Sequence, residues 1–133
     1  ILHRRAQSHY TRALKEFGIS SAEYPVLFYL QREEGRTQDE IAAELSIDKS
    51  AVTRIVRSLC DKGLVIRSQD SEDRRCNRVW LTGRGHDTAG PIRQAKKEWS
   101  AILLDHISEE EQDILAGLLE RMAANVEEKT ATK

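Results

Sequence analysis

The side chains best suited to chemistry with a charged partner lie in the middle of the sequence, between residues 49 and 78. Residues 49–62 carry apolar side chains at steps of three and four, the spacing of one face of an α-helix. The apolar positions are Val52, Ile55, Val56 and Leu59. The opposite face presents basic and hydroxyl side chains, namely Lys49, Ser50, Thr53, Arg54 and Arg57. Arginine forms paired hydrogen bonds with guanine, and hydroxyl groups bond base edges or phosphates. This face is therefore suited to the major groove of DNA.

A second charged segment follows directly. Residues 68–78, SQDSEDRRCNR, hold three acids, three arginines and a cysteine, and the β-rich runs 64–67 and 78–81 flank them. This pattern indicates a β-hairpin with a long tip. Arginine fits the narrow minor groove of DNA, whose negative potential attracts it. Asp73 is placed to orient Arg75, or an arginine of the 49–62 helix, through a forked bond. A self-neutralised polar turn is the alternative interpretation.

The charge is distributed unevenly along the chain. The whole chain has a formal charge of −1, which neither favours nor opposes nucleic acid. Residues 49–78, however, contain eight bases and four acids, whereas residues 105–133 contain eight acids and three bases. On an isolated helix, basic side chains indicate only a solvated surface. A basic helix followed by a basic hairpin instead favours DNA binding.

Composition limits the class of protein. A chain of 133 residues that is 39% hydrophobic and 32% charged is expected to form one folded, soluble domain. No apolar run approaches the roughly 18 residues that a membrane helix needs, and no signal peptide is expected. Two cysteines, Cys60 and Cys76, do not make a disulfide framework. We therefore expect a cytoplasmic protein.

Helix boundaries are marked by local signals. Three capping boxes are present, SSAE at 20–23, TQDE at 37–40 and SEEE at 108–111. Gly63 is typical of a helix end and Asp48 of an N-cap. The expected helices are 1–17, 20–32, a short helix from Thr37, 49–62, 83–106 with a kink at Gly90-Pro91, and 109–127. A tight turn at 46–48 joins two of them as a helix-turn-helix. The sequence thus predicts a mainly α (α+β) winged helix-turn-helix with a small β-hairpin wing.

The segment DKSAVTRIVRSLCDKGLVIRSQDSEDRRCNRVWLTGRG, residues 48–85, resembles the core signature of the MarR family of bacterial winged-helix repressors. Its Asp-Lys-Ser-x-x-Thr-Arg start, Lys-Gly-Leu-Val helix end, Asp-x-Arg wing and Leu-Thr-x-x-Gly exit are in register. The flanking helices match in order, so the resemblance covers nearly the whole chain. It implies a homodimer that binds a pseudo-palindromic operator and represses transcription.

The resemblance also implies roles for individual residues. Ser50, Thr53, Arg54 and Arg57 would enter the major groove. Arg75 would enter the minor groove with Asp73 beside it, and Arg74 would contact phosphate. Residues 1–19 and 90–133 would form a helical dimerisation region, and residues 20–89 the DNA-binding lobe.

Members of the family often release DNA when a small aromatic or phenolic acid binds or when a cysteine is oxidised. The residues expected near an effector cleft are His9, Tyr10, Arg12, Tyr24 and Phe28, although aromatic residues at such spacings are also typical of a core. Cys76, beside Arg74 and Arg75, is a candidate reactive thiol. The thiol sensors of the family carry their cysteine in the N-terminal helix, where this chain has none. An inert Cys76 is therefore the favoured interpretation, and Cys60 is expected to be packed and inert.

Other functions are poorly supported by the sequence. The histidines, His3, His9, His86 and His106, are scattered, so neither a metal site nor any cofactor is expected. A nucleophile with a base, or a carboxylate pair in a cleft, is not evident, so the chain is not expected to be an enzyme. A winged helix used only for protein contacts is a further alternative, but a neutral or acidic recognition face would favour it.

Overall fold

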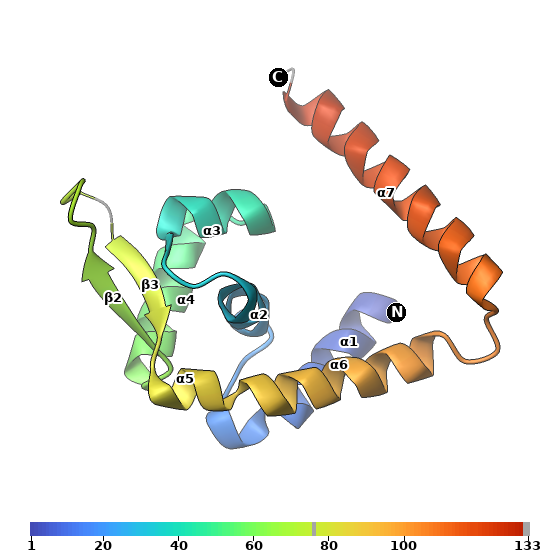
Figure 1. The fold of residues 1–133 in the computed structure, drawn as a ribbon, viewed down its shortest axis with the longest axis horizontal. Coiled ribbons are helices and arrows are strands. Elements are labelled where there is room, and N and C mark those ends of the chain that lie inside the picture. Colours follow the sequence, from blue (N-terminus) through green and yellow to red (C-terminus); the bar gives the residue numbers. More distant parts are fainter. Residues whose placement is uncertain (76, 132–133) are drawn as a thin grey trace. The chain divides into compact units, whose positions relative to one another are not determined.

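The computed structural model describes residues 1–75 and 77–131 and consists of helices with one small antiparallel sheet (Figure 1). The elements are α1 (Leu2–Ala13), the 3-10 helix η1 (Lys15–Phe17), α2 (Tyr24–Arg32), β1 (Arg36–Thr37), α3 (Gln38–Leu45), α4 (Lys49–Asp61), β2 (Val65–Gln69), β3 (Asn77–Leu81), α5 (Gly83–Asp87), α6 (Ala89–Leu103) and α7 (Glu109–Ala131). The chain divides into two compact units, Ile1–Lys97 and Glu98–Lys133. A mainly α winged helix-turn-helix is the fold that the sequence predicts.

The helix-turn-helix consists of α3 and α4, and its boundaries confirm the local signals. Thr37 caps α3, because its hydroxyl accepts a hydrogen bond from the Glu40 N–H at 3.1 Å. Asp48 stands at the N-cap of α4. At the other end of α4, Gly63 adopts a φ of +73°, a left-handed conformation that glycine takes without steric cost. The helix therefore stops there and the chain turns into β2.

The sheet has the strand order β1-β3-β2, and all pairs are antiparallel. The hairpin register runs from Val65 opposite Leu81 to Gln69 opposite Asn77. Each strand is one residue longer than predicted: β2 begins at Val65 and ends at Gln69 instead of spanning 64–67, and β3 begins at Asn77 instead of residue 78. The two-residue strand β1 pairs Arg36 with Val79 and was not predicted, because two residues carry no readable periodicity. It attaches the wing to the segment just before α3.

One hydrophobic core holds the first unit together. Its members come mainly from α2, α3, α4, β2, β3 and α6, and the fully buried ones include Leu14, Leu27, Leu30, Ile41, Val52, Val56, Leu59, Leu64 and Val79. Burial of each such side chain contributes about 1.5–3 kcal/mol to folding. The apolar side chains of α2 are not all buried to the same degree. Val26 and Tyr29 are buried, whereas Tyr24 and Phe28 are half-buried and pack at the edge of the core.

The first two helices are shorter than predicted. α1 ends at Ala13 and continues as η1. The capping box of Ser20 and Glu23 forms both of its bonds, at 3.1 and 3.3 Å, but it closes a turn, and α2 begins only at Tyr24. Pro25 explains this later start, because proline is tolerated in the first turn of a helix, where its missing N–H has no partner to lose.

The predicted helix 83–106 is two helices, α5 and α6, with the break at Thr88. Pro91 has no N–H to donate to the carbonyl of Asp87, the last residue of α5, and its ring would clash with that carbonyl. The series of helical backbone hydrogen bonds is interrupted there and resumes with the bond from the Ile92 N–H to the Thr88 carbonyl oxygen at 2.9 Å. α5 also needs Gly85, because a methyl group at that position would lie 2.1 Å from the Leu64 carbonyl oxygen.

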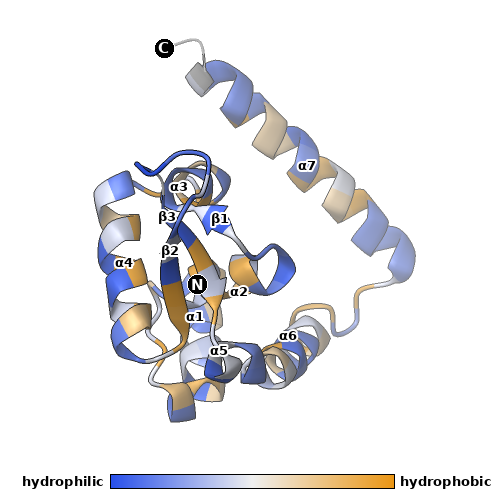
Figure 2. Ribbon diagram, turned by 60° about the vertical axis from the view of Figure 1, so that its left-hand side comes forward, coloured by the Kyte–Doolittle hydropathy of each residue, from blue (hydrophilic) through white to orange (hydrophobic). Residues whose placement is uncertain are grey.

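The second unit contains the end of α6 and the long helix α7. The capping box of Ser108 and Glu111 forms both bonds, at 3.0 and 3.1 Å. Apolar residues recur along α7 at helical spacing, as the orange bands of Figure 2 show. The side chains of six of them are exposed: Ile114, Leu115, Leu118, Leu119, Met122 and Val126. Within residues 1–75 and 77–131, no helix is long and apolar enough to cross a membrane.

Candidate nucleic-acid interface

Helix α4 presents the polar face that the sequence predicts. Val52, Val56 and Leu59 are fully buried, and the core therefore fixes the rotation of the helix. Arg54 and Arg57 are exposed. Among the described residues, neither arginine has a hydrogen-bond or ion-pair partner. Both guanidinium groups are therefore available to a ligand of this face.

The other polar side chains of this face have partners within the lobe. Thr53 donates to the Lys49 carbonyl oxygen at 3.0 Å and contacts Gln38 Oε1 at 3.3 Å. The Lys49 ammonium lies 3.4 Å from Asp39, and both side chains are mostly exposed. Ser50 donates its hydroxyl to the Asp48 carboxylate. That hydrogen bond is the main reason why the pKa of Asp48 lies below its ordinary value. These exposed contacts are weak, so the three side chains can exchange them for others.

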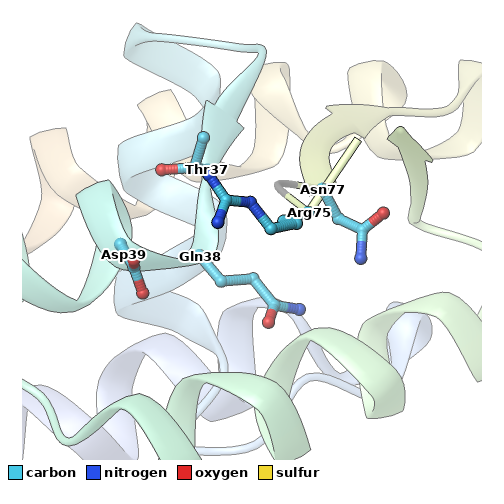
Figure 3. Close-up of a pocket in the computed structure, with 5 residues that line it drawn as sticks. All are labelled: Thr37, Gln38, Asp39, Arg75 and Asn77. Carbon is cyan, nitrogen blue, oxygen red and sulfur yellow. The ribbon is translucent and has the colours of Figure 1, made fainter. Parts of the chain in front are cut away.

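The wing brings Asp73 and Arg75 together as the sequence predicts. Asp73 Oδ1 accepts hydrogen bonds from the Arg75 backbone N–H at 3.1 Å and from its Nε at 3.2 Å. The Arg75 side chain is nevertheless 91% exposed. It reaches over the start of α3, where it lines a small polar pocket of about 110 Å³ together with Thr37, Gln38, Asp39 and Asn77 (Figure 3). The carboxylate thus orients the guanidinium without covering it.

The remaining wing arginines differ from each other. Arg74 is exposed, and its carbonyl oxygen accepts a hydrogen bond from Gln69 Nε2 at 2.6 Å. Arg78 is paired with Asp70 at 3.0 Å. Cys76, the candidate redox residue, lies outside the described residues. No short-range signal in the sequence singles out the pair Asp70 and Arg78, because eight residues and a loop separate them.

The residues expected near an effector cleft are largely brought together. The rings of Tyr10, Tyr24 and Phe28 lie 5.0–5.2 Å apart between centroids. His9 stacks edge-on against Tyr10 at 5.3 Å and contacts the Ala95 carbonyl oxygen at 2.8 Å. Arg12 is exposed and joins none of these ring contacts. Burial raises the pKa of Tyr10 and of Tyr24, so both hydroxyl groups stay protonated at neutral pH.

The sequence did not indicate the cation beside these rings. Lys96 of α6 places its Nζ 4.6 Å from the centre of the Phe28 ring, a cation–π arrangement. Burial, and to a lesser degree the nearby charge of Arg32, lowers the pKa of Lys96. Lys96 lies 68 positions after Phe28 and 86 positions after Tyr10, so only the fold brings them together. The described residues contain no cluster of ligands able to hold a metal ion, and Cys60 packs half-buried against the core.

Comparison with known proteins places this geometry in a family. The family model described as the MarR family matches residues 17–75. The HTH-type transcriptional regulator YdgJ of Bacillus subtilis is 31% identical over 109 residues, which are 82% of this chain and 66% of that protein. SarZ of Staphylococcus epidermidis, also an HTH-type transcriptional regulator, is 27% identical over 93% of this chain and 82% of its own length. The chain spans about two thirds of the length of the first curated regulators it matches.

Solved structures share both sequence and fold with this chain. A MarR transcriptional regulator from Methanosarcina mazei Go1 is 32% identical and superposes with a TM-score of 0.86 over 93% of this chain and 89% of that one. The MepR–DNA complex of Staphylococcus aureus is 26% identical, with a TM-score of 0.83 over 92% and 90% of the two chains. The matched proteins are named as transcriptional regulators and not as enzymes. The winged helix, its basic recognition face and these similarities together assign the chain to the MarR family of transcriptional regulators.

Proposed function

We propose that this chain is a sequence-specific regulator that binds double-stranded DNA with α4 in the major groove and the wing in the adjacent minor groove. One observation supports this most strongly. On the wing that follows the basic helix α4, Arg75 is held by Asp73 at 3.2 Å and is still 91% exposed. A pre-oriented, exposed arginine loses little conformational freedom when it enters a groove, and the narrow minor groove attracts arginine.

The polar residues of the α4 face, together with Arg74 of the wing, make three kinds of contact in this proposal. Arg54 and Arg57, which have no hydrogen-bond or ion-pair partner among the described residues, bond base edges. Ser50 and Thr53 exchange their weak contacts within the lobe for bases or phosphates. Lys49 and Arg74 contact phosphate, which positions the protein without reading the sequence.

The proposal includes a homodimer that binds a pseudo-palindromic operator. The apolar stripe of α7, from Ile114 to Val126, is exposed in a single chain, and an exposed stripe of this length is typical of a helix that packs against a partner. Two copies that associate through residues 1–19 and 90–133 would cover it. Two recognition helices in one dimer require two half-sites about one turn of DNA apart.

Repression relieved by a small aromatic or phenolic acid completes the proposal. The ring cluster of Tyr10, Tyr24 and Phe28 provides an apolar surface, and Lys96, 4.6 Å above Phe28, provides a cation for the carboxylate. An acid bound here would lie against α2 and α6, which pack on the same core as α4. Benzoate and 4-hydroxybenzoate are the probes. They should weaken DNA binding by the wild type, and Lys96→Met should reduce that response.

Binding of the purified protein to the DNA upstream of its own gene, measured as salt is raised, tests the proposed function. The affinity should fall linearly on a logarithmic scale, with a slope of about −0.9 per phosphate contact. A scrambled duplex of the same composition is the control, and it should bind more weakly at every salt concentration. Absent binding, or binding that does not change with salt, would contradict the proposal.

A further inference from the structure

Arg78 is an arginine of the wing that the proposed DNA contact does not use. It lies on β3, the middle strand, with Ser68 of β2 on one side and Thr37 of β1 on the other. Its side chain is only 36% exposed, against 91% for Arg75. An arginine held this far from solvent on the central strand is placed to organise the wing.

The guanidinium of Arg78 joins two segments that are distant in sequence. Its Nε donates to Asp70 Oδ2 at 3.1 Å, its Nη2 lies 3.0 Å from the same oxygen in an ion pair, and its Nη1 donates to the Gly35 carbonyl oxygen at 2.7 Å. Asp70 begins the wing loop immediately after β2, and Gly35 lies just before β1 and α3. The side chain therefore connects the wing loop to the entrance of the helix-turn-helix.

Asp70 is held from a second direction as well. Its other oxygen, Oδ1, accepts a hydrogen bond from the Glu72 N–H at 3.0 Å, and the side chain is 13% exposed. Gln69 closes the far side of the loop through its bond to the Arg74 carbonyl oxygen. The backbone that carries Asp73 and Arg75 is therefore fixed at both of its ends.

We propose that Arg78, clamped between Asp70 and Gly35, is a positioning residue that sets the wing loop so that Arg75 meets DNA, and that Arg78 does not itself contact DNA. This inference rests on the proposed DNA-binding function. A planar guanidinium can bond the carboxylate and the carbonyl at the same time, which a lysine ammonium cannot reproduce with the same geometry. Fixing the loop before binding reduces the conformational entropy that association must otherwise overcome.

The substitution Asp70→Asn tests the clamp against simple electrostatics. Removing a negative charge from a DNA-facing loop should by itself tighten binding to DNA. If Asp70 holds Arg78 and the loop, the same substitution should weaken binding, by an amount up to the loss of about tenfold expected for Arg75→Ala. Glu72→Gln is the matched control, because Glu72 is an exposed acid of the same loop whose side chain has no part in the clamp. It should leave the affinity unchanged or raise it.

A double-mutant cycle separates positioning from direct contact. Arg78→Gln should add little to Arg75→Ala, because both remove the same contact with DNA, whereas it should add fully to Arg54→Ala on α4. The slope of log affinity against log salt concentration should be the same for Arg78→Gln as for Arg75→Ala. The double variant should have that same slope. A phosphate contact made by Arg78 itself would instead lower the slope of the double variant by about 0.9 more.

The outcomes distinguish this inference from the proposed function. If the wild type does not bind DNA, the proposed function fails. If the wild type binds but Asp70→Asn binds as tightly or more tightly, or if Arg78→Gln and Arg75→Ala are additive, the positioning role is wrong. Weaker binding by Asp70→Asn, together with non-additive wing variants, supports it. Circular dichroism and thermal melting of each variant confirm that the measured affinity belongs to folded protein.

Discussion

The first unit, residues 1–97, buries most of its large apolar side chains, whereas the second unit, residues 98–133, exposes most of its own. Leu14, Leu27 and Leu59 of the first unit are fully buried, and Leu118 and Leu119 of the second are 47% and 53% exposed. Both units contain amphipathic helices that begin with well-formed caps. The difference therefore lies not in the helices but in what covers them. The first unit covers its apolar faces with its own elements, whereas the apolar stripe of α7 is left uncovered within the second unit.

The two units also differ in charge. Residues 49–78 of the first unit are basic, and residues 105–133 are acidic. A basic segment attracts DNA, and an acidic segment is repelled by it. The basic segment thus lies in the unit that contains the helix-turn-helix, and the acidic segment lies in the unit whose apolar stripe is exposed.

Truncation of a leucine gives the largest expected difference between the units. Leu59→Ala leaves a cavity in the core and should lower the free energy of unfolding by about 2–5 kcal/mol. Leu119→Ala removes the same atoms from an exposed position and should cost less than about 1 kcal/mol in dilute protein, where no partner is bound. Urea denaturation measures both. Equal losses at low concentration would mean that the second unit has a core of its own.

The association of two chains is expected to show the next largest effect. Leu118→Asp places a charge on the apolar stripe, and burying it against a partner should weaken the dimer by about 100-fold or more, since an unpaired buried charge is strongly unfavourable. Sedimentation equilibrium across a range of concentrations measures this. Glu120→Gln, a change on the same helix outside the stripe, is the control. A variant that associates like the wild type would exclude α7 from the interface.

Acid should destabilise the first unit through Glu23. Burial acts to raise the pKa of this carboxyl, which is 3% exposed, but its hydrogen bonds from Lys62 and Ser20 outweigh burial and lower it. A lowered pKa means that the ionised carboxylate stabilises the fold above the ordinary glutamate pKa. That contribution is lost as pH falls through the folded value. Glu23→Gln should lower the free energy of unfolding by about 1–3 kcal/mol at neutral pH. Urea denaturation at a series of pH values should then show a smaller loss of stability in acid for this variant than for the wild type.

A glutamate of the second unit provides the contrast for this acid effect. Hydrogen bonds from Ser108 lower the pKa of Glu111, but Glu111 is exposed. Glu111→Gln should therefore change the pH series far less than Glu23→Gln. If Glu23→Gln loses as much stability in acid as the wild type does, the acid sensitivity comes from another residue.

The smallest effect concerns a helix cap. Ser108 accepts the hydrogen bond from the Glu111 N–H at 3.1 Å, so Ser108→Ala should reduce the stability of α7 by about 1 kcal/mol. Hydrogen exchange of the first turn of α7 reports this directly. Protection should fall in α7 and remain unchanged in α4. A loss of protection in α4 of the same size would mean that the two units unfold together.

The sequence predicted features that depend on short-range chemistry. The cap at Thr37, the stop at Gly63 and the contact of Asp73 with Arg75 each involve residues two to three apart or one backbone conformation. The break at Thr88 was missed, because a kink was expected at Pro91 itself. The carbonyl that Pro91 leaves without a donor lies four residues earlier.

Features that depend on tertiary contacts were not predictable from local pattern. The clamp between Arg78 and Gly35 spans 43 residues, and Lys96 meets Phe28 only because α6 packs beside α2. The spacing of residues along the sequence does not indicate such pairs. The DNA-binding, dimer and effector roles assigned to individual residues remain predictions, and the variants described above test them.

Affinity for operator DNA, compared between two single-charge variants, tests the central claim most directly. Arg57→Gln removes a cation from the exposed face of α4, and Lys97→Gln removes one from an exposed position on α6. If α4 reads the DNA, Arg57→Gln should weaken binding by about tenfold, and Lys97→Gln should stay close to the wild type. Equal losses in the two variants, or no loss in Arg57→Gln, would contradict the assignment of DNA binding to this face.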